Sequence, residues 1–320
     1  MGITERLVKI VFLILSVLIF LTACEKKDIK TTKEAKKLSV ITSLFPVYDF
    51  AKEIAKDKAS VILLLPPGIE PHSFEPKPAD IVSLSNADIF IYTNKYMEPW
   101  TDDILKGINN QNLIVVNTSK GIKLAKQKNG HSHHGKKNKH EHLDPHIWLD
   151  FSNAIVMIDN ITEGLIKKDP SNSGFYKQNA EVFKKRIIEL DEKFKKSLDT
   201  CEKRIFISGG HFSFGYLADR YGLKYISAFE GFSPDAEPSA RQISKIIKTM
   251  KEHGLKHIFY EELITPRIAE TVQRETGASL LLLHAAHNIS KNELAKGETF
   301  MSLMEKNLQN LITGLQCQQK

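Results

Sequence analysis

The amino-acid sequence predicts an α/β fold in which two lobes, each built on a parallel sheet, are joined by a single long rigid helix. Short runs rich in β-branched and aromatic residues, which are typical of strands, alternate with amphipathic helical patterns. Such alternation favours a largely parallel sheet. It occurs twice, before and after one uninterrupted helical stretch, and so predicts two lobes. The predicted strands are 38–42, 60–65, 88–92 and 112–116 in the first lobe, and 204–210, 224–227, 257–262 and 279–283 in the second.

Amphipathic helical patterns supply the layers that cover these sheets. In the first lobe, residues 46–58 begin with Pro46, which suits the first turn of a helix, and residues 152–168 form a second helix. The stretch 174–200 has no glycine or proline after Gly174, and at 1.5 Å per residue it is about 35–40 Å long. The second lobe has helices at 238–254 and 297–315, and the predicted boundaries are 38–172 for the N-terminal lobe, 173–200 for the linking helix and 201–320 for the C-terminal lobe.

The N-terminus has the pattern of an export signal. A basic start precedes the apolar run 10–21, which is shorter than the roughly 20 residues that span a bilayer. The sequence LTAC that ends at Cys24 resembles a bacterial lipobox, in which the cysteine is lipidated and becomes the first mature residue. We therefore expect a lipoprotein signal peptide at 1–23, a flexible charged tether at 24–37, and attachment to the extracytoplasmic face of the cell membrane. An ordinary signal peptide with an incidental cysteine is the alternative.

Charge and cysteine content narrow the classes of partner. The formal net charge is +7 at pH 7, but the lysines are interleaved with acidic residues, which indicates a solvated surface and no nucleic-acid partner. Beyond Cys24 the chain has only Cys201 and Cys317, too few and too scattered for a thiolate zinc site. These two cysteines either pair in a disulfide or remain buried thiols, and the sequence gives no distance that decides between the two.

Five of the 12 histidines stand after predicted strands or beside glycine or proline turns. They are His72, His146, His211, His284 and His287. In open α/β sheets, ligands gather at the carboxyl ends of the strands. A lone histidine there is usually a polar loop residue, so the argument is collective. Imidazoles from both lobes predict a metal site in the cleft between the lobes, and zinc is the metal that favours nitrogen ligands in tetrahedral sites.

A histidine-rich segment interrupts the first lobe at 125–142. Its five histidines lie among lysines, glycine and serine; they are His131, His133, His134, His140 and His142. This composition predicts a flexible loop outside the fold, whose histidines bind metal weakly. A solvated loop without such a role is the alternative. His146 differs, because Asp144-Pro145 precedes it and an apolar run that contains Trp148 follows it.

Four motifs follow one another along the chain. They are GIEPHSFEPKPAD (68–80), DPHIWLD (144–150), GGHFSFGYLADRYGL (209–223) and GFSPDAEPSARQI (231–243). In this order they resemble the zinc- and manganese-binding receptors of bacterial ABC importers, and the resemblance extends from about residue 38 to the C-terminus. It implies two α/β lobes linked by one long helix, which agrees with the pattern of strands and helices. It also implies three metal ligands, His72, His146 and His211.

The fourth ligand departs from the pattern of these receptors. Manganese receptors carry aspartate there and many zinc receptors carry glutamate, whereas this chain has LHAAHNIS at 283–290. Matching the leucine and the following apolar-serine pattern places His287 at the carboxylate's position, with His284 and Glu70 as alternatives. Because imidazole suits zinc and carboxylate suits manganese, the resemblance implies zinc as the cargo, with manganese less favoured.

Together these observations predict a monomeric, lipid-anchored receptor that binds zinc with high affinity and delivers it to the membrane subunits of an ABC permease. We expect no enzymatic activity. The rival from another class is a cell-surface zinc-dependent hydrolase, in which three histidines hold the metal and Glu70 acts as a base, although the chain has no HExxH motif. A manganese receptor and an adhesion lipoprotein are further alternatives, and no adhesive repeat is present in the sequence.

The predicted loop can be tested by deleting residues 126–142. We expect one tight zinc site to remain, because His146 lies outside the deletion, and any additional weak zinc binding to disappear. Equilibrium titration of the full chain and the shortened chain with zinc would count the ions bound to each. Loss of the tight site in the shortened chain would contradict the prediction.

Overall fold

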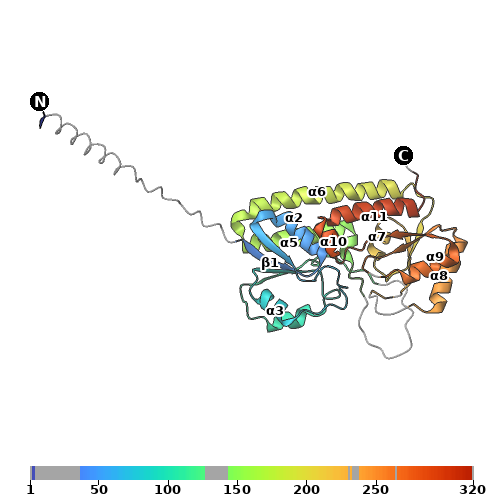
Figure 1. The fold of residues 1–320 in the computed structure, drawn as a ribbon, viewed down its shortest axis with the longest axis horizontal. Helices are drawn as coiled ribbons and strands as arrows, with labels where there is room; N and C mark the ends of the chain where they lie inside the picture. The colour runs from blue at the N-terminus through green and yellow to red at the C-terminus, as the bar shows by residue number, and fades with distance from the viewer. Residues whose placement is uncertain are drawn as a thin grey trace. The chain divides into compact units, whose positions relative to one another are not determined.

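The structure is a computed structural model that describes residues 2–3, 37–126, 143–229, 231–232, 238–263 and 265–318. Residues Lys37–Lys320 form one compact unit (Figure 1). Cys24, the tether up to residue 36 and the five histidines of the loop lie outside the described residues, so what the sequence predicts for them stays a prediction. Within the described ranges, no helix has both the length and the apolar content needed to cross a membrane.

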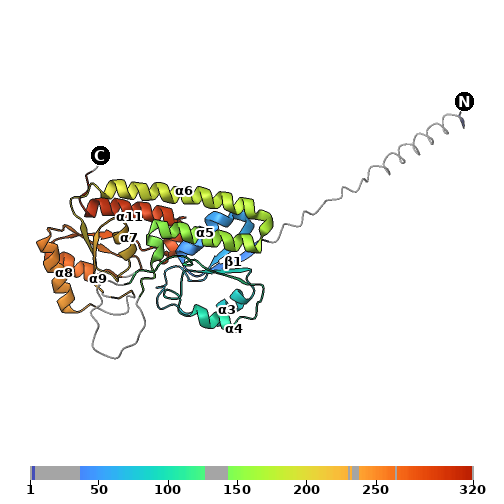
Figure 2. The same ribbon diagram turned by 180° about the vertical axis from the view of Figure 1, so that it is seen from behind.

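The first sheet has four parallel strands in the order β2-β1-β3-β4. The strands are β1 (Leu38–Thr42), β2 (Ala59–Leu63), β3 (Ile89–Tyr92) and β4 (Ile114–Asn117), and the covering helices are α2 (Phe45–Ala55), α3 (Pro78–Ser85), α4 (Thr101–Gly107) and α5 (Phe151–Lys168). Helices α2 and α5 pack on one face, and α3 and α4 on the other (Figures 1 and 2). Because both faces are covered, strands such as β3 are apolar along their whole length.

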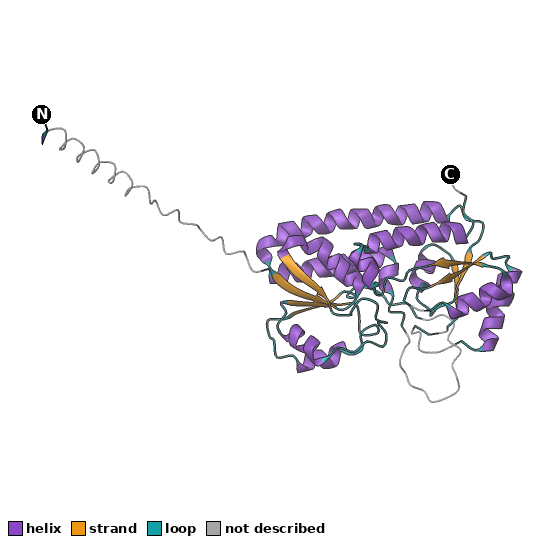
Figure 3. Cartoon of the chain, viewed as in Figure 1, coloured by secondary structure: helices purple, strands orange, loops and turns teal. Residues whose placement is uncertain are grey.

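The second sheet repeats this arrangement with the parallel order β6-β5-β7-β8. Figure 3 shows the strands of both sheets in orange with helices packed around them. The strands are β5 (Ile205–Ser208), β6 (Lys224–Ser227), β7 (His257–Tyr260) and β8 (Ser279–Leu282), and the helices are α7 (Gly215–Arg220), α8 (Ala240–Glu252), α9 (Arg267–Thr276) and α11 (Phe300–Gly314). Helices α8 and α9 pack on the face that carries Ile207 and Ile258. Helices α7 and α11 pack on the face that carries Phe206 and Phe259.

The long helix predicted between the sheets is α6 (Ser173–Leu198), whose 26 residues extend for about 39 Å. It lies beside α11 and packs on α2 and α5 (Figure 1). Five phenylalanines form an aromatic cluster along it: Phe50 of α2, Phe151 of α5, Phe183 and Phe194 of α6, and Phe300 of α11. The cluster therefore joins the layers of both sheets into one hydrophobic core. The predicted fold class is confirmed, while the predicted lobe boundaries stay a prediction.

The structure departs from the sequence prediction mainly at short elements. Helices α3, α4, α7 and α9, and α10 (Lys291–Ala295), are not predicted, because five to ten residues are too few to display a clear helical period. The predicted strand 257–262 is too long at its carboxyl end. Strand β7 stops at Tyr260, and Glu261 and Glu262 leave the sheet and contact histidines.

Cys201 and Cys317 pair in a disulfide bridge, which decides a question that the sequence leaves open. The bridge joins the segment between α6 and β5 to the segment after α11, across 116 residues of sequence. A backbone hydrogen bond from Lys203 N to Leu315 O, 3.0 Å long, lies next to it. The C-terminal helix is thereby fastened to the start of the second sheet.

Replacing both Cys201 and Cys317 by serine should lower the free energy of unfolding by about 2–4 kcal/mol, because the bridge restricts the unfolded chain over a long loop. Denaturant unfolding of the oxidised wild type beside the double variant would measure the difference. Reduction of the wild type should reproduce it. Equal stability of the oxidised protein and the double variant would contradict the prediction.

Candidate metal centre

Four histidines from different loops meet at one point. His72 lies in the loop after β2, His146 just before α5, His211 after β5 and His287 after β8. All six pairs of ring centroids are 4.8–5.5 Å apart. One ligand nitrogen of each ring lies within 4.8 Å of those of the others. We call these four residues the histidine cluster.

The strand order of the second sheet explains part of this convergence. From β5 the chain adds β6 on one side and then returns to add β7 on the other. Such a reversal opens a crevice at the carboxyl ends of the two central strands, where ligands of open α/β sheets bind. His211 follows β5 and Glu261 follows β7, so the imidazole and the carboxylate emerge side by side at this crevice.

The Nε2 atoms of the histidine cluster are the nitrogens available to bind a metal. His146, His211 and His287 are 0–4% exposed and His72 is half-buried, yet the Nε2 atom of each has no hydrogen-bond partner among the described residues. A buried polar atom left without a partner costs free energy. Four nitrogen donors that converge in this way match the ligand set of a tetrahedral zinc site.

Carboxylates stand behind three of the four rings. Nδ1 of His146 lies 2.7 Å from Asp144 Oδ1, and Nδ1 of His211 lies 2.6 Å from Glu261 Oε2. Nδ1 of His287 lies 3.3 Å from Glu262 Oε1. A carboxylate on one ring nitrogen fixes the orientation of the ring and leaves the other nitrogen to face a metal.

Burial makes two of the rings poor bases. It lowers the pKa of His72 and of His146 well below the usual value, and the neighbouring histidines lower both further. These two rings are therefore neutral at pH 7, the state in which an imidazole can bind a metal. Burial also raises the pKa of Asp144 to about 8, so this carboxyl group is largely protonated at pH 7 in the absence of metal.

His211 behaves differently because of its acidic partner. Burial alone lowers its pKa, but the Glu261 carboxylate outweighs burial, and the net pKa of His211 is raised. The Glu261 carboxylate therefore favours the protonated ring of His211, and metal binding competes with this protonation. The Glu262 carboxyl, in contrast, has its pKa lowered to about 2, because the charge of His284 and the hydrogen bond with His287 outweigh burial.

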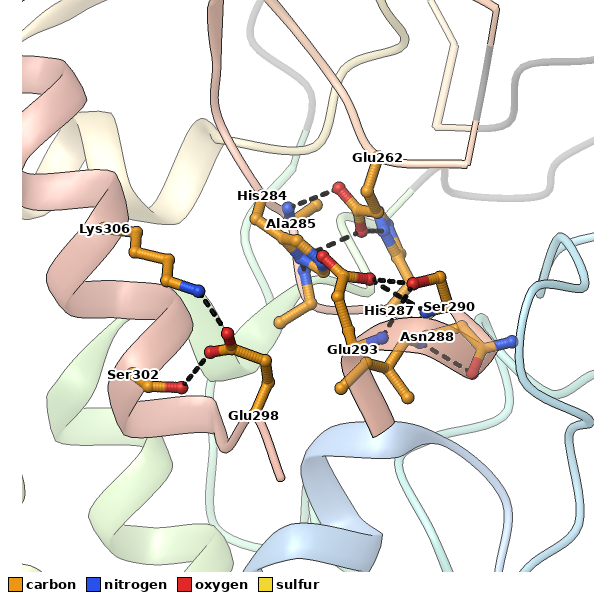
Figure 4. A network of polar contacts seen from close by, with 12 residues as sticks. Glu262, His284, Ala285, His287, Asn288, Ser290, Glu293, Glu298, Ser302 and Lys306 are labelled. Atoms are coloured by element: carbon orange, nitrogen blue, oxygen red, sulfur yellow. Dashed lines mark hydrogen bonds and ion pairs between the residues drawn. The ribbon is translucent and has the colours of Figure 1, made fainter. Parts of the chain in front are cut away.

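His284 lies outside the histidine cluster. Its Nδ1 accepts a hydrogen bond from Ala286 N at 2.9 Å and is 3.5 Å from Glu262, and its Nε2 lies 3.7 Å from Glu293 Oε1 (Figure 4). Both ring nitrogens thus face groups other than the cluster. Burial lowers its pKa, but Glu262 and Glu293 outweigh burial and raise it.

Glu70 also lies outside the cluster. Its carboxylate accepts hydrogen bonds from the backbone N and the hydroxyl of Ser73, at 2.9 and 3.1 Å, within its own loop. The sequence reasoning missed Glu261 and Glu262, which it included in a strand. Their position at the carboxyl end of that strand is the same signal that identified the histidines.

The fold and the histidine cluster define the class of this protein as a metal-binding receptor. Its two α/β lobes are joined by a long helix, and its buried imidazole site lies at the ends of the strands. Residues 40–314 match the family described as "Zinc-uptake complex component A periplasmic". The chain belongs to this family.

The relatives agree with this membership. The high-affinity zinc uptake system protein ZnuA of Bacillus subtilis is 36% identical over 94% of this chain and 95% of its own length. The Zn(II)-bound ZnuA-like domain of Streptococcus pneumoniae AdcA is 29% identical, with a TM-score of 0.74 over 88% of this chain and 99% of that one. The laminin-binding protein Lmb of Streptococcus agalactiae is 30% identical, with a TM-score of 0.76 over 87% and 99%. The chain spans only 61% of the length of the AdcA proteins of Streptococcus pyogenes.

Proposed function

We propose that this protein is an extracytoplasmic receptor that binds one zinc ion through His72, His146, His211 and His287 and delivers it to an ABC permease. One observation carries the proposal: four buried Nε2 atoms converge without another partner among the described residues. Membership of the zinc-uptake family supports the transport role. Zinc is here the cargo of the receptor.

The donor set favours zinc over manganese. All four members of the cluster offer imidazole nitrogen, which suits zinc, whereas manganese prefers carboxylate and water oxygen. The nearby carboxylates of Asp144, Glu261 and Glu262 contact the Nδ1 atoms of the rings and orient them. A manganese receptor is therefore the less favoured alternative.

His287 is our choice for the fourth ligand. Its Nε2 atom is buried and has no partner within the described part of the chain, while its Nδ1 lies near Glu262. The two alternatives from the sequence are engaged elsewhere, since His284 contacts Ala286 and Glu293, and Glu70 binds Ser73.

Receptor function fits the site better than hydrolysis does. A catalytic zinc site keeps an open position for water and has a general base nearby. Here four nitrogens would complete a tetrahedron, and Glu70, the base required by the hydrolase alternative, is bound to Ser73 within its loop. We therefore propose that the protein has no enzymatic activity.

Adhesion is the second candidate function. It is favoured by the likeness to the laminin-binding protein of Streptococcus agalactiae, which is described as having both adhesin and metal transporting activity. Binding of the purified protein to immobilised laminin, with and without zinc, would test it. Absence of binding above a control protein would remove this candidate.

The site and the tether together suggest how the receptor works at the membrane. We propose that Cys24 carries a lipid that holds a monomeric receptor at the outer face of the cytoplasmic membrane, close to the permease. Incorporation of a labelled fatty acid into the wild type and not into Cys24→Ser would test the anchor independently of zinc binding.

Replacing His72, His146, His211 or His287 singly by alanine should weaken zinc binding at least 100-fold and abolish the zinc-dependent rise in melting temperature, because a ligand of the native state stabilises it by mass action. Chelator competition and thermal unfolding would measure both effects. Exposed His253, at the end of α8, provides the control, and its alanine variant should bind zinc as the wild type does. Wild-type affinity in any of the four variants would remove that residue from the site. A greater loss from His284→Ala than from His287→Ala would reverse our choice of fourth ligand.

Zinc binding at pH 7 should release protons. The Asp144–His146 pair supplies one, because the Asp144 carboxyl, with a pKa of about 8, ionises when Nδ1–H of His146 donates to it, and His211, whose pKa is raised, adds to the release. Affinity should therefore fall about 10-fold or more as the pH drops from 7.5 to 6.5. Calorimetry in buffers of different ionisation enthalpy would count the protons. Glu261→Gln should reduce the number, and zinc binding by the wild type without proton release would contradict this account.

A further inference from the structure

The loop that carries His287 is docked on the loop that carries His72. The buried side chain of Asn288 donates two hydrogen bonds through Nδ2, to Pro66 O and to Ile69 O, both 2.8 Å long. Its Oδ1 accepts from Ile289 N at 2.8 Å (Figure 4). Both N–H groups and the oxygen of this carboxamide therefore form hydrogen bonds. The two bonds from Nδ2 join the loop after β8 to the loop after β2.

The segment held by Asn288 is a tight turn. Ile69 N donates to Pro66 O at 3.2 Å, and Gly68 adopts a positive φ of 89° within the turn. Gly68 N also donates to Ile289 O at 2.9 Å, so a third hydrogen bond joins the two loops. His72 follows three residues after the end of this turn.

His72 is the member of the histidine cluster that needs such support. The rings of His146, His211 and His287 each have a carboxylate near Nδ1, whereas no carboxylate of the described residues lies within ion-pair distance of the His72 ring. Its ring is also the least buried of the four. The position of His72 therefore depends on its backbone. The turn before His72 forms the hydrogen bonds that join this backbone to the loop of His287.

We propose that Asn288 is a positioning residue for zinc binding: by holding the turn Pro66–Ile69 next to His287, it sets the distance between the imidazoles of His72 and His287. This rests on the function proposed above. The two ring centroids lie 5.5 Å apart. A hydrogen bond from Phe45 N to His287 O, 3.3 Å long, holds the backbone of His287 in place. Only a carboxamide of this length supplies two N–H donors and one acceptor here, because an aspartate would place oxygen against two carbonyl oxygens.

Asn288→Asp keeps the shape of the side chain and removes both donors. We expect it to weaken zinc binding about 10- to 100-fold, the usual effect of losing a group that orients a metal ligand, and to speed zinc release. Chelator competition and stopped-flow release would measure these effects. Asn110→Asp is the matched control, because half-buried Asn110 also donates to two backbone carbonyls, Ser85 O and Ala87 O at 2.9 and 3.0 Å, but lies in the first lobe away from the cluster.

A double-mutant cycle separates positioning of His72 from general loosening of the site. If Asn288 acts through His72, the substitution should have little further effect on zinc affinity in the His72→Ala background. An undiminished effect in that background, or wild-type affinity in Asn288→Asp, would overturn the proposal. Absence of tight zinc binding in the wild type would instead overturn the proposed function.

A second variant guards against misfolding. Asn288→Ala removes the donors without placing an oxygen against the carbonyls, and it should give the same loss of affinity with the same dependence on His72. If neither variant folds, the carboxamide supports the fold and not the ligand, and the proposal is equally overturned.

Discussion

The metal centre depends on one constraint: each buried imidazole has to keep Nε2 free of a proton and pointed at its neighbours. Carboxyl groups near Nδ1 meet the second part of this constraint for His146, His211 and His287, because they orient the rings so that Nε2 faces the cluster. The Glu262 carboxylate, whose pKa is lowered, also places negative charge next to the His287 ring. Burial of the rings serves the same end for His146, because it lowers the pKa and keeps the ring neutral. Orientation, charge and burial thus act together, and the loops and sheets serve to bring these groups to one place.

Each sheet has a buried glutamate after its third strand in order, but the two have different purposes. In the first sheet Glu98 lies in the loop six residues after the end of β3, and in the second Glu261 directly follows β7. The buried carboxyl of Glu98 accepts hydrogen bonds from Ser43 and from the backbone N atoms of Thr93 and Asn94, both at 2.9 Å. Burial raises its pKa to about 7.

Asn94 connects the Glu98 carboxyl group to the metal centre through hydrogen bonds. The Asn94 side chain donates to Pro145 O at 3.1 Å, next to His146. Glu98 therefore organises the loops that hold one cluster histidine, whereas Glu261 contacts its histidine itself. The same strand order has produced a structural carboxyl group in one lobe and a ligand-orienting one in the other.

The sequence could predict the fold class and the histidines, because both leave periodic or local signals. Strands of the parallel sheets are apolar runs, α6 is too long to be overlooked, and strand-end histidines beside glycine or proline are conspicuous. The sequence ranks His287 above His284 only through a short motif match, since both follow β8, and the contacts of Glu262 and Glu293 distinguish the two rings in space. Short helices, the disulfide and the carboxylates behind the rings depend on distances between remote segments, which no local pattern contains.

The shared core limits how such a site can exchange its metal. Rings of the aromatic cluster pack edge to face, as Phe50 does on Phe183 and Phe300, and each such pair contributes about 0.5–1.5 kcal/mol beyond burial. Separating the sheets as rigid bodies would break this core. The loops around the cluster are joined by a few hydrogen bonds, three between the His72 and His287 loops and one from Trp148 Nε1 to Ala285 O at 2.7 Å, each worth about 0.5–1.5 kcal/mol. Opening one loop therefore costs much less than moving a lobe. We expect metal to enter and leave by displacement of the loop that carries His72, the cluster residue that is half-buried and has no carboxylate partner among the described residues.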